Sequence, residues 1–138
     1  MAVMVTGGTG FIGRRIIRKL LDIGEEVVCF DLAPINTNMV SSLDNLKSYR
    51  GDVTQIPHLL EAVNIHNVDR IIHMAALLPP DTEDRPHFGM LVNIQGTNNV
   101  FEVARWTNVK RVVYASSIAV YGVQETFGPQ LTPDQQLV

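Results

Sequence analysis

Three glycines near the start of the chain have the spacing that lets a backbone wrap around phosphate groups. Gly7, Gly10 and Gly13 lie in the run Thr6–Gly13, after an apolar stretch and before a segment of helical periodicity. In that setting the first glycine permits a tight turn, the second lets the backbone approach a pyrophosphate, and the third lets helix and strand pack closely. The positive end of the helix dipole then faces the phosphates. No Lys-Ser/Thr pair follows the last glycine, which excludes a Walker A loop.

An acidic residue follows the glycine turn at the distance typical of a residue that binds the ribose of a dinucleotide. Asp31 lies 18 residues beyond the last glycine, close to the separation of about 20 that is typical of dinucleotide sites. Its carboxylate can accept hydrogen bonds from both hydroxyls of an adenine ribose and would repel a 2′-phosphate. With the turn, which includes Phe11 and Ile12, it predicts a site for NAD. Arg14 and Arg15 argue for NADP instead, because arginines at a helix start can reach a 2′-phosphate.

The elements that must position these residues alternate in type along the chain. Apolar runs at residues 2–5, 26–31, 70–74 and 111–115 predict strands, and a further short strand is expected at 47–50, before Gly51. Segments of helical period predict helices at 11–23, 56–65 and 88–106. A polar, proline-bearing loop is expected at 79–86. Strands that are buried on both faces and joined by helices form a parallel sheet, and right-handed crossovers give the order 3-2-1-4-5. We therefore predict an α/β fold: a Rossmann-type doubly wound parallel sheet in residues 1–122, with a loop-like extension at 123–138.

Composition fits a single globular domain and excludes several classes of partner. The chain is 46% hydrophobic and 18% charged with a net charge of −3, and no block of Lys or Arg indicates binding to nucleic acid or to a membrane surface. Cys29 is the only cysteine, which excludes an internal disulfide, and its apolar neighbours predict a buried, inert thiol. The four histidines are scattered over separate elements, so no metal site is predicted. The expected compartment is the cytoplasm.

Five motifs occur in a fixed order along the chain. They are the glycine turn, Gly51-Asp52-Val53, His73-Met74-Ala75-Ala76, Asn93-Ile94-Gln95-Gly96-Thr97 and Ala115-Ser116-Ser117-Ile118-Ala119-Val120-Tyr121-Gly122. Together they resemble the extended short-chain dehydrogenase/reductase family, and more narrowly its NAD-dependent epimerase/dehydratase group. The resemblance runs from residue 2 to about residue 122. It implies NAD as the cofactor, a nucleotide sugar as the substrate and hydride transfer as the chemistry.

The resemblance also implies which residues contact the adenosine half of the cofactor. Asp52 and Val53 would meet the adenine, with the carboxylate of Asp52 bonding the exocyclic amine. Ala75, Ala76 and Leu77 would line the cofactor, since small side chains let a dinucleotide lie against the backbone.

For the reacting half, the resemblance points to three further residues. Asn93 would approach the nicotinamide ribose, and Ala115 would lie beneath the nicotinamide ring. Ser117 matches the family's catalytic Ser/Thr, which hydrogen-bonds the reacting hydroxyl of the substrate. Two alternatives stay open: Ser116 supplies that hydroxyl instead, or Asn93 only ties its helix to the strand at 111–115. His73 is expected to be a strand histidine with satisfied hydrogen bonds.

The family's catalytic base is missing from these residues. It is a tyrosine in a Tyr-x-x-x-Lys pair, where the lysine is needed because free tyrosine has a pKa of about 10. None of the three tyrosines has a lysine four positions later. We therefore expect a chain truncated before that pair and before the family's remaining strands and substrate domain, and inactive alone. The alternative is a non-catalytic dinucleotide-binding regulatory or sensor module. The apolar surface of the helix at 88–106 exceeds what one sheet face covers, which predicts a homo-oligomer.

Overall fold

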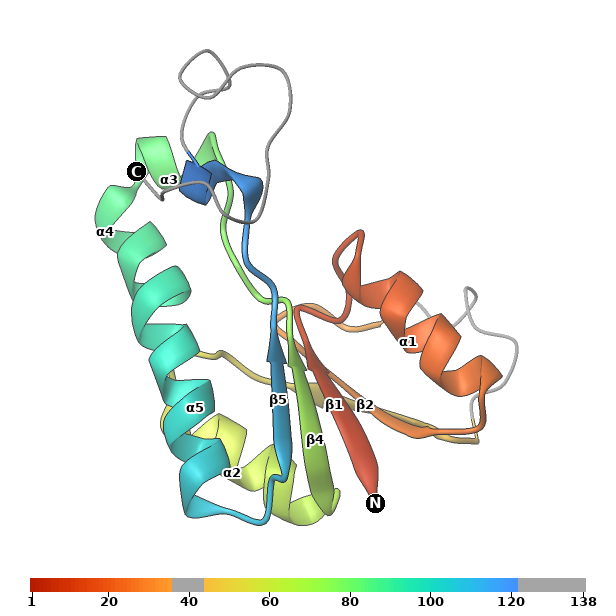
Figure 1. Ribbon diagram of the computed structural model, residues 1–138. Helices are drawn as coiled ribbons and strands as arrows, with labels where there is room; N and C mark the ends of the chain where they lie inside the picture. Colours follow the sequence, from red (N-terminus) through yellow and green to blue (C-terminus); the bar gives the residue numbers. More distant parts are fainter. Residues whose placement is uncertain (36–43, 122–138) are drawn as a thin grey trace.

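One parallel sheet organises the computed structural model, which describes residues 1–35 and 44–121 (Figure 1). Its strands are β1 (Ala2–Thr6), β2 (Glu26–Asp31), β3 (Leu46–Arg50), β4 (Val68–His73) and β5 (Arg111–Tyr114). They lie in the order β3-β2-β1-β4-β5, with every neighbouring pair parallel. The predicted α/β fold and its strand order are confirmed. The expected extension at 123–138 lies outside the described residues, so the domain boundary stays a prediction.

Helices cover both faces of this sheet. Figure 1 shows α1 (Gly13–Asp22) on one side, with α2 (Ile56–Ile65) and α5 (Thr97–Trp106) on the other. Right-handed crossovers from parallel strands place helices in this way. The carboxyl ends of the strands are therefore left to the loops, and four of the five predicted motifs begin at one of those ends. The fifth, Asn93–Thr97, lies in the helical run that ends in α5.

The core alternates between the two faces along β2. Val27 and Cys29 pack with Ile17 of α1, whereas Val28 and Phe30 join the larger cluster under α2 and α5. Successive residues of a strand point to opposite faces, so a run that is apolar throughout is what a sheet covered on both sides requires. Burial raises the pKa of the Cys29 thiol to about 12, and the charge of nearby Asp31 acts in the same direction. The thiol is buried, in agreement with its predicted inert character.

The expected helix at 88–106 is a longer and less regular run. It consists of α4 (Pro86–Met90), the π-helical segment η2 (Leu91–Gly96) and α5. The expected loop at 79–86 was wrong in part, because it contains the short helix α3 (Asp81–Asp84). Three acidic residues in its first turn favour a helix start through the helix dipole, and Asp81 accepts a hydrogen bond from Arg85 at 3.2 Å.

Strand β4 begins two residues earlier than the apolar pattern indicates. Val68 is buried in the core, and the carboxylate of Asp69 lies 3.3 Å from the Arg70 guanidinium and 3.6 Å from the Lys110 ammonium. An acidic residue inside a strand reads as polar in the sequence. Here, cations on β4 and next to β5 compensate its charge, so the strand tolerates it.

Candidate cofactor site

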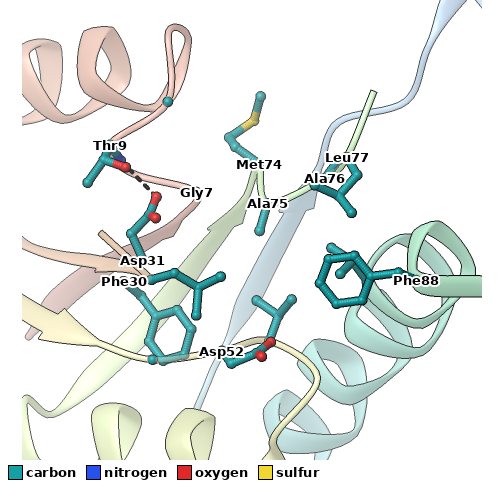
Figure 2. A pocket seen from close by; sticks show the side chains of 15 residues that line it. Gly7, Thr9, Phe30, Asp31, Asp52, Met74, Ala75, Ala76, Leu77 and Phe88 are labelled. Carbon is teal, nitrogen blue, oxygen red and sulfur yellow. Dashed lines mark hydrogen bonds between the residues drawn. The ribbon is translucent and has the colours of Figure 1, made fainter. Parts of the chain in front are cut away.

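A cleft of about 300 Å³ opens at the carboxyl ends of β1, β2 and β4 (Figure 2). It is lined by Gly7, Thr9, Gly10, Phe30, Asp31, Leu32, Gly51, Asp52, Val53, Met74, Ala75, Ala76, Leu77, Phe88 and Val92. In Figure 2, Asp31 and Thr9 stand on one side, and Ala76, Leu77 and Phe88 stand on the other. Open parallel sheets hold ligands at this edge, where the strand order reverses between the first and fourth strands. The cleft volume is at the lower end of the range for small-molecule sites.

The glycine turn requires its three glycines for different reasons. Gly7 has φ of +65°, and a Cβ there would lie 2.7 Å from the backbone nitrogen of Ala75. Gly10 donates its N–H to the Gly7 carbonyl at 3.1 Å, and a Cβ on Gly13 would overlap that same carbonyl oxygen. Gly7 and Gly10 thus present bare backbone to the cleft, which fits the close approach of a pyrophosphate.

Phe11 and Ile12 lie beside the cleft and not in its lining. Both are exposed, and the guanidinium of Arg15 lies 3.7 Å from the centre of the Phe11 ring. Arg15 also donates from Nη1 to the Phe11 carbonyl at 3.0 Å, and the Arg14 guanidinium lies 5.6 Å from the ring centre. The two arginines that could have favoured NADP therefore both lie on Phe11.

Asp31 ends β2 at the wall of the cleft. Its Oδ2 accepts the backbone N–H of Thr9 at 3.0 Å, and its Oδ1 accepts the N–H of Ala33 at 3.1 Å. These bonds hold the carboxylate against the glycine turn without burying it. A carboxylate has more acceptor sites than the two used here, so it can still accept from the hydroxyls of a ribose. The arrangement fits the nucleoside role predicted for it.

The segment after β3 forms the next part of the wall. Asp52 Oδ1 accepts the N–H of Thr54 at 2.8 Å, and the Asp52 N–H donates to His58 Nδ1 at 3.2 Å. Val53 is buried, and its carbonyl accepts a hydrogen bond from Asn99 Nδ2 at 3.0 Å. Backbone and side chain are both fixed, so Asp52 and Val53 present a defined surface to the cleft.

The loop after β4 lines the cleft through Met74, Ala75, Ala76 and Leu77. Its far end is held by Asn93, whose Oδ1 accepts the Leu77 N–H at 2.8 Å and whose Nδ2 donates to the Leu77 carbonyl at 2.9 Å. Asn93 does tie its helical run to a neighbour, but that neighbour is the loop after β4 and not the strand at 111–115. Asn93 is not among the residues that line the cleft, so its contact with a nicotinamide ribose stays a prediction.

The two residues predicted for the reacting end lie just past β5. The Ala115 N–H donates to the His73 carbonyl at 3.4 Å, which continues the pairing with β4 for one residue. Ser117 Oγ accepts the N–H of Ala119 at 3.2 Å at the start of the short helix η3 (Ile118–Tyr121). Both residues are exposed and neither lines the cleft, so the structure does not join them to the adenosine-side residues.

His73 takes part in a buried set of hydrogen bonds that the sequence did not reveal. Its Nδ1 lies 2.6 Å from Thr6 Oγ1, and its Nε2 lies 3.0 Å from Thr97 Oγ1. The expectation of a satisfied strand histidine is confirmed. Burial lowers the pKa of His73 to about 4, so the ring is neutral at pH 7. Thr97 belongs to the quoted Asn93–Thr97 motif, which is the one signal that links it to the site.

Thr9, Phe30, Leu32, Met74, Phe88 and Val92 also line the cleft and were not predicted to do so. Phe88 is 36% exposed, and the Arg85 guanidinium lies 5.3 Å from its ring centre. Thr9 lies inside the Thr6–Gly13 run and Met74 inside the His73–Ala76 motif, so assigning the whole of each motif to the site would have found them. Nothing in the sequence marks Phe88.

Two absences within residues 1–35 and 44–121 concern metal ions and membranes. Within these ranges no group of three or more His, Cys, Asp or Glu side chains is placed to hold a metal ion. No helix in the same part of the chain has the length and apolar character needed to cross a membrane.

A parallel sheet with a glycine turn at its switch point and an acid at the end of β2 defines a dinucleotide-binding Rossmann domain. Residues 3–136 match the model of the NAD dependent epimerase/dehydratase family. The chain belongs to that family.

Individual relatives show how wide the family is. The chain is 31% identical to UDP-glucose 4-epimerase of Halalkalibacterium halodurans over 123 residues, which is 88% of this chain and 36% of the relative. It is 33% identical to 3 beta-hydroxysteroid dehydrogenase/Delta 5-->4-isomerase of Mycobacterium tuberculosis over 123 residues, 86% of this chain and 32% of the relative. The chain thus spans about a third of the length of these curated relatives.

A solved structure with bound NAD is also similar to this chain. MoeE5 in complex with UDP-glucose and NAD matches with a TM-score of 0.75 and 32% identity, over 88% of this chain and 38% of that one. The predicted family and the NAD dependence of the family are confirmed.

Proposed function

We propose that this chain is the NAD-binding part of an epimerase/dehydratase-type oxidoreductase. The observation that carries the proposal is the glycine turn joined to Asp31 by the Thr9 hydrogen bond on one side of the cleft, with Asp52, Val53 and the Ala75–Leu77 loop completing its wall. The pyrophosphate would lie on the bare backbone of the turn, and the adenine ribose would lie at Asp31. The cleft lining is apolar beside Val53, which suits the adenine ring.

The substrate we propose is a nucleotide sugar, and the reaction is hydride transfer at one of its hydroxyl-bearing carbons. NAD, when bound, supplies the hydride acceptor. Ser117 would hydrogen-bond the reacting hydroxyl: its oxygen accepts from Ala119, so its proton can donate. Support for a sugar comes from the solved relative that holds UDP-glucose, whereas the steroid dehydrogenase relatives favour a 3-hydroxysteroid.

These 138 residues contain no Tyr-x-x-x-Lys pair. We propose that they bind NAD without measurable turnover, because Ser117 alone offers no base near the pKa that proton removal at neutral pH needs. A dinucleotide-binding regulatory or sensor module is the second candidate, and the same absence favours it.

Calorimetric titration of the chain with NAD and with NADP tests the binding proposal. We expect saturable binding of NAD and weaker binding of NADP. Incubation with NAD and either UDP-sugars or 3-hydroxysteroids, followed at 340 nm, tests the proposal of inactivity. No binding of NAD would refute the cofactor site, and NADH formation would refute inactivity while identifying the substrate class.

A further inference from the structure

A network of buried and partly buried hydrogen bonds links the two loops that form the cofactor cleft. Thr6 ends β1 directly before the glycine turn, and its hydroxyl meets His73 at the end of β4. The same hydroxyl accepts the N–H of Met74 at 3.2 Å and that of Ala75 at 3.3 Å. Met74 also donates to the Thr6 carbonyl at 3.1 Å. The Thr6 hydroxyl is the hydrogen-bond partner that the structure gives to the Ala75 N–H.

The partners fix where each proton lies. A hydroxyl has one proton and two lone pairs. The lone pairs of Thr6 Oγ1 face two N–H donors, so its proton points to His73 Nδ1, which must be the unprotonated nitrogen. Thr97 Oγ1 donates to the Asn93 carbonyl at 2.7 Å, so it accepts from His73 Nε2. The ring is therefore the neutral Nε2–H tautomer, and its two neighbours are oriented by it.

This orientation bears directly on the wall of the cleft. Ala75 lies so close to the turn that a Cβ on Gly7 would meet its backbone nitrogen at 2.7 Å. The Ala75 N–H donates to a lone pair of the Thr6 hydroxyl oxygen, so the hydroxyl proton must point away from Ala75. The His73 ring, 1% exposed, is the acceptor that draws this proton away.

The chain of bonds continues to the other end of the loop. These hydrogen bonds run from His73 through Thr97 to the carbonyl of Asn93. The Asn93 side chain in turn hydrogen-bonds both backbone groups of Leu77. The loop Met74–Leu77 is thus fastened at its first and last residues to a single network, with the imidazole at its centre.

We propose that His73 is a positioning residue for the cofactor: by orienting the Thr6 hydroxyl it fixes the Ala75 wall of the cleft against the glycine turn. The proposal rests on NAD as the ligand of the cleft. His73 is buried and does not line the cleft, so its effect on binding passes through Thr6.

Two substitutions of His73 test the roles of its two ring nitrogens separately. His73→Asn can place an amide oxygen where Nδ1 lies and keeps the acceptor for Thr6, whereas His73→Gln can place an amide nitrogen near Nε2 and keeps only the donor to Thr97. We expect the Asn variant to hold its Kd for NAD within about twofold of the parent chain. The Gln variant should bind about threefold to tenfold more weakly, the effect of one lost hydrogen bond. Ile71→Val, a buried change on the same strand outside the network, controls for loss of stability.

A second pair tests the route through Thr6. Thr6→Val, which removes the hydroxyl and keeps the shape, should weaken NAD binding as His73→Gln does, and the double variant should be little worse than either single one. Equal Kd values for the Asn and Gln variants, or independent additive losses in the double variant, would overturn the proposal.

One readout does not depend on NAD. Amide hydrogen exchange at Ala75 should accelerate in the Gln variant and stay near that of the parent in the Asn variant. If the parent chain binds no NAD, the proposed function fails by itself, and the Ala75 exchange rates then decide whether His73 positions the loop. Equal exchange at Ala75 in both variants would end the proposal.

Discussion

The side-chain amide of Asn93 satisfies both backbone polar groups of Leu77, with bonds of 2.8 Å to its N–H and 2.9 Å to its carbonyl. These are the bonds a neighbouring strand would make, supplied here by one side chain. Asn93 lies in the π-helical segment η2, a geometry that is rare and often found at functional sites. The loop after β4 has no strand beside it at this point, so the amide provides its only such support in the described part of the chain.

Replacing Asn93 by Asp should destabilise the fold by about 1–3 kcal/mol, because a carboxylate oxygen then faces the Leu77 carbonyl in place of a donor. Urea unfolding measures the change. Asn98→Asp adds the same charge at an exposed position of α5 and serves as the control. Equal destabilisation in the two variants would show that the Asn93–Leu77 hydrogen bonds do not contribute to the stability of the fold.

The sheet could be predicted because its signals are local. Four of the five strands are short apolar runs, three of the four crossovers have a helical period, and the order of a doubly wound sheet follows from their alternation. The irregular features could not be predicted in the same way. The π-helical turn at Asn93 coincides with a bond to Leu77, 16 positions earlier in the chain, and no local pattern encodes that distance.

The residues of the candidate site also divide into those that local sequence patterns predict and those that depend on distant contacts. The glycine turn, Asp31 and Asp52 follow strands directly, so motif order was enough to place them around one cleft. His73 looked like an ordinary apolar-strand histidine because its partners, Thr6 and Thr97, come from two other elements. The placement of Ser117 relative to the cleft depends on how the chain runs beyond β5, and sequence motifs carry no such geometry.

Alanine at two glycines of the turn should separate folding from binding. Gly13→Ala should cost about 1–3 kcal/mol or more of stability, because its Cβ would overlap the Gly7 carbonyl oxygen. In Gly10→Ala the Cβ would lie 3.2 Å from that oxygen, a tight contact that needs a smaller shift, so the loss of stability should be smaller than in Gly13→Ala. The Kd for NAD should nevertheless rise about tenfold, because a methyl group then separates the backbone from the pyrophosphate.

Thermal unfolding and NAD titration of both alanine variants check this prediction. If Gly10→Ala bound NAD as tightly as the parent chain, the pyrophosphate would have to lie elsewhere than on the turn.

Asp31→Asn should weaken NAD binding by about tenfold or more, because hydrogen bonds to a charged acceptor are worth about 1.5–3 kcal/mol. It should also narrow the difference between NAD and NADP, since the charge that opposes a 2′-phosphate is gone. Calorimetry with both dinucleotides gives the ratio. Asp22→Asn, an exposed change at the end of α1, is matched in charge and should alter neither value. An unchanged ratio for Asp31→Asn would remove Asp31 from the ribose site.

Stability should fall on acidification because of His73. Its pKa is lowered from 6.5 to about 4 in the folded chain, so between these values the unfolded state binds a proton that the folded state does not. The contribution is present above pH 6.5 and is lost as the pH falls towards 4, by about 3 kcal/mol in total. Denaturant unfolding at a series of pH values measures it.

His66 has a pKa lowered by burial, and the Arg70 guanidinium lowers that of Glu25, so both add a dependence of the same sign. The informative quantity is therefore the difference between the parent chain and His73→Asn, which lacks the titrating ring. We expect the variant to show a shallower decline between pH 6.5 and pH 4. Parallel curves for the two proteins would mean that the His73 ring titrates normally in the folded state.

Self-association is expected through the outer face of the helical run. Met90, Ile94, Phe101 and Trp106 are between 45% and 67% exposed, although Val100 and Val103 of the same run are fully buried in the core. Several exposed apolar side chains along one helical run are typical of interfaces. Ile94→Lys should therefore shift the sedimentation profile at tens of micromolar towards the monomer, because burying a lysine in an apolar interface is unfavourable. Asn64→Lys, with the same added charge on an exposed position of α2, should leave the profile unchanged. A parent chain that sediments as a sharp monomer would refute this interface before any variant is made.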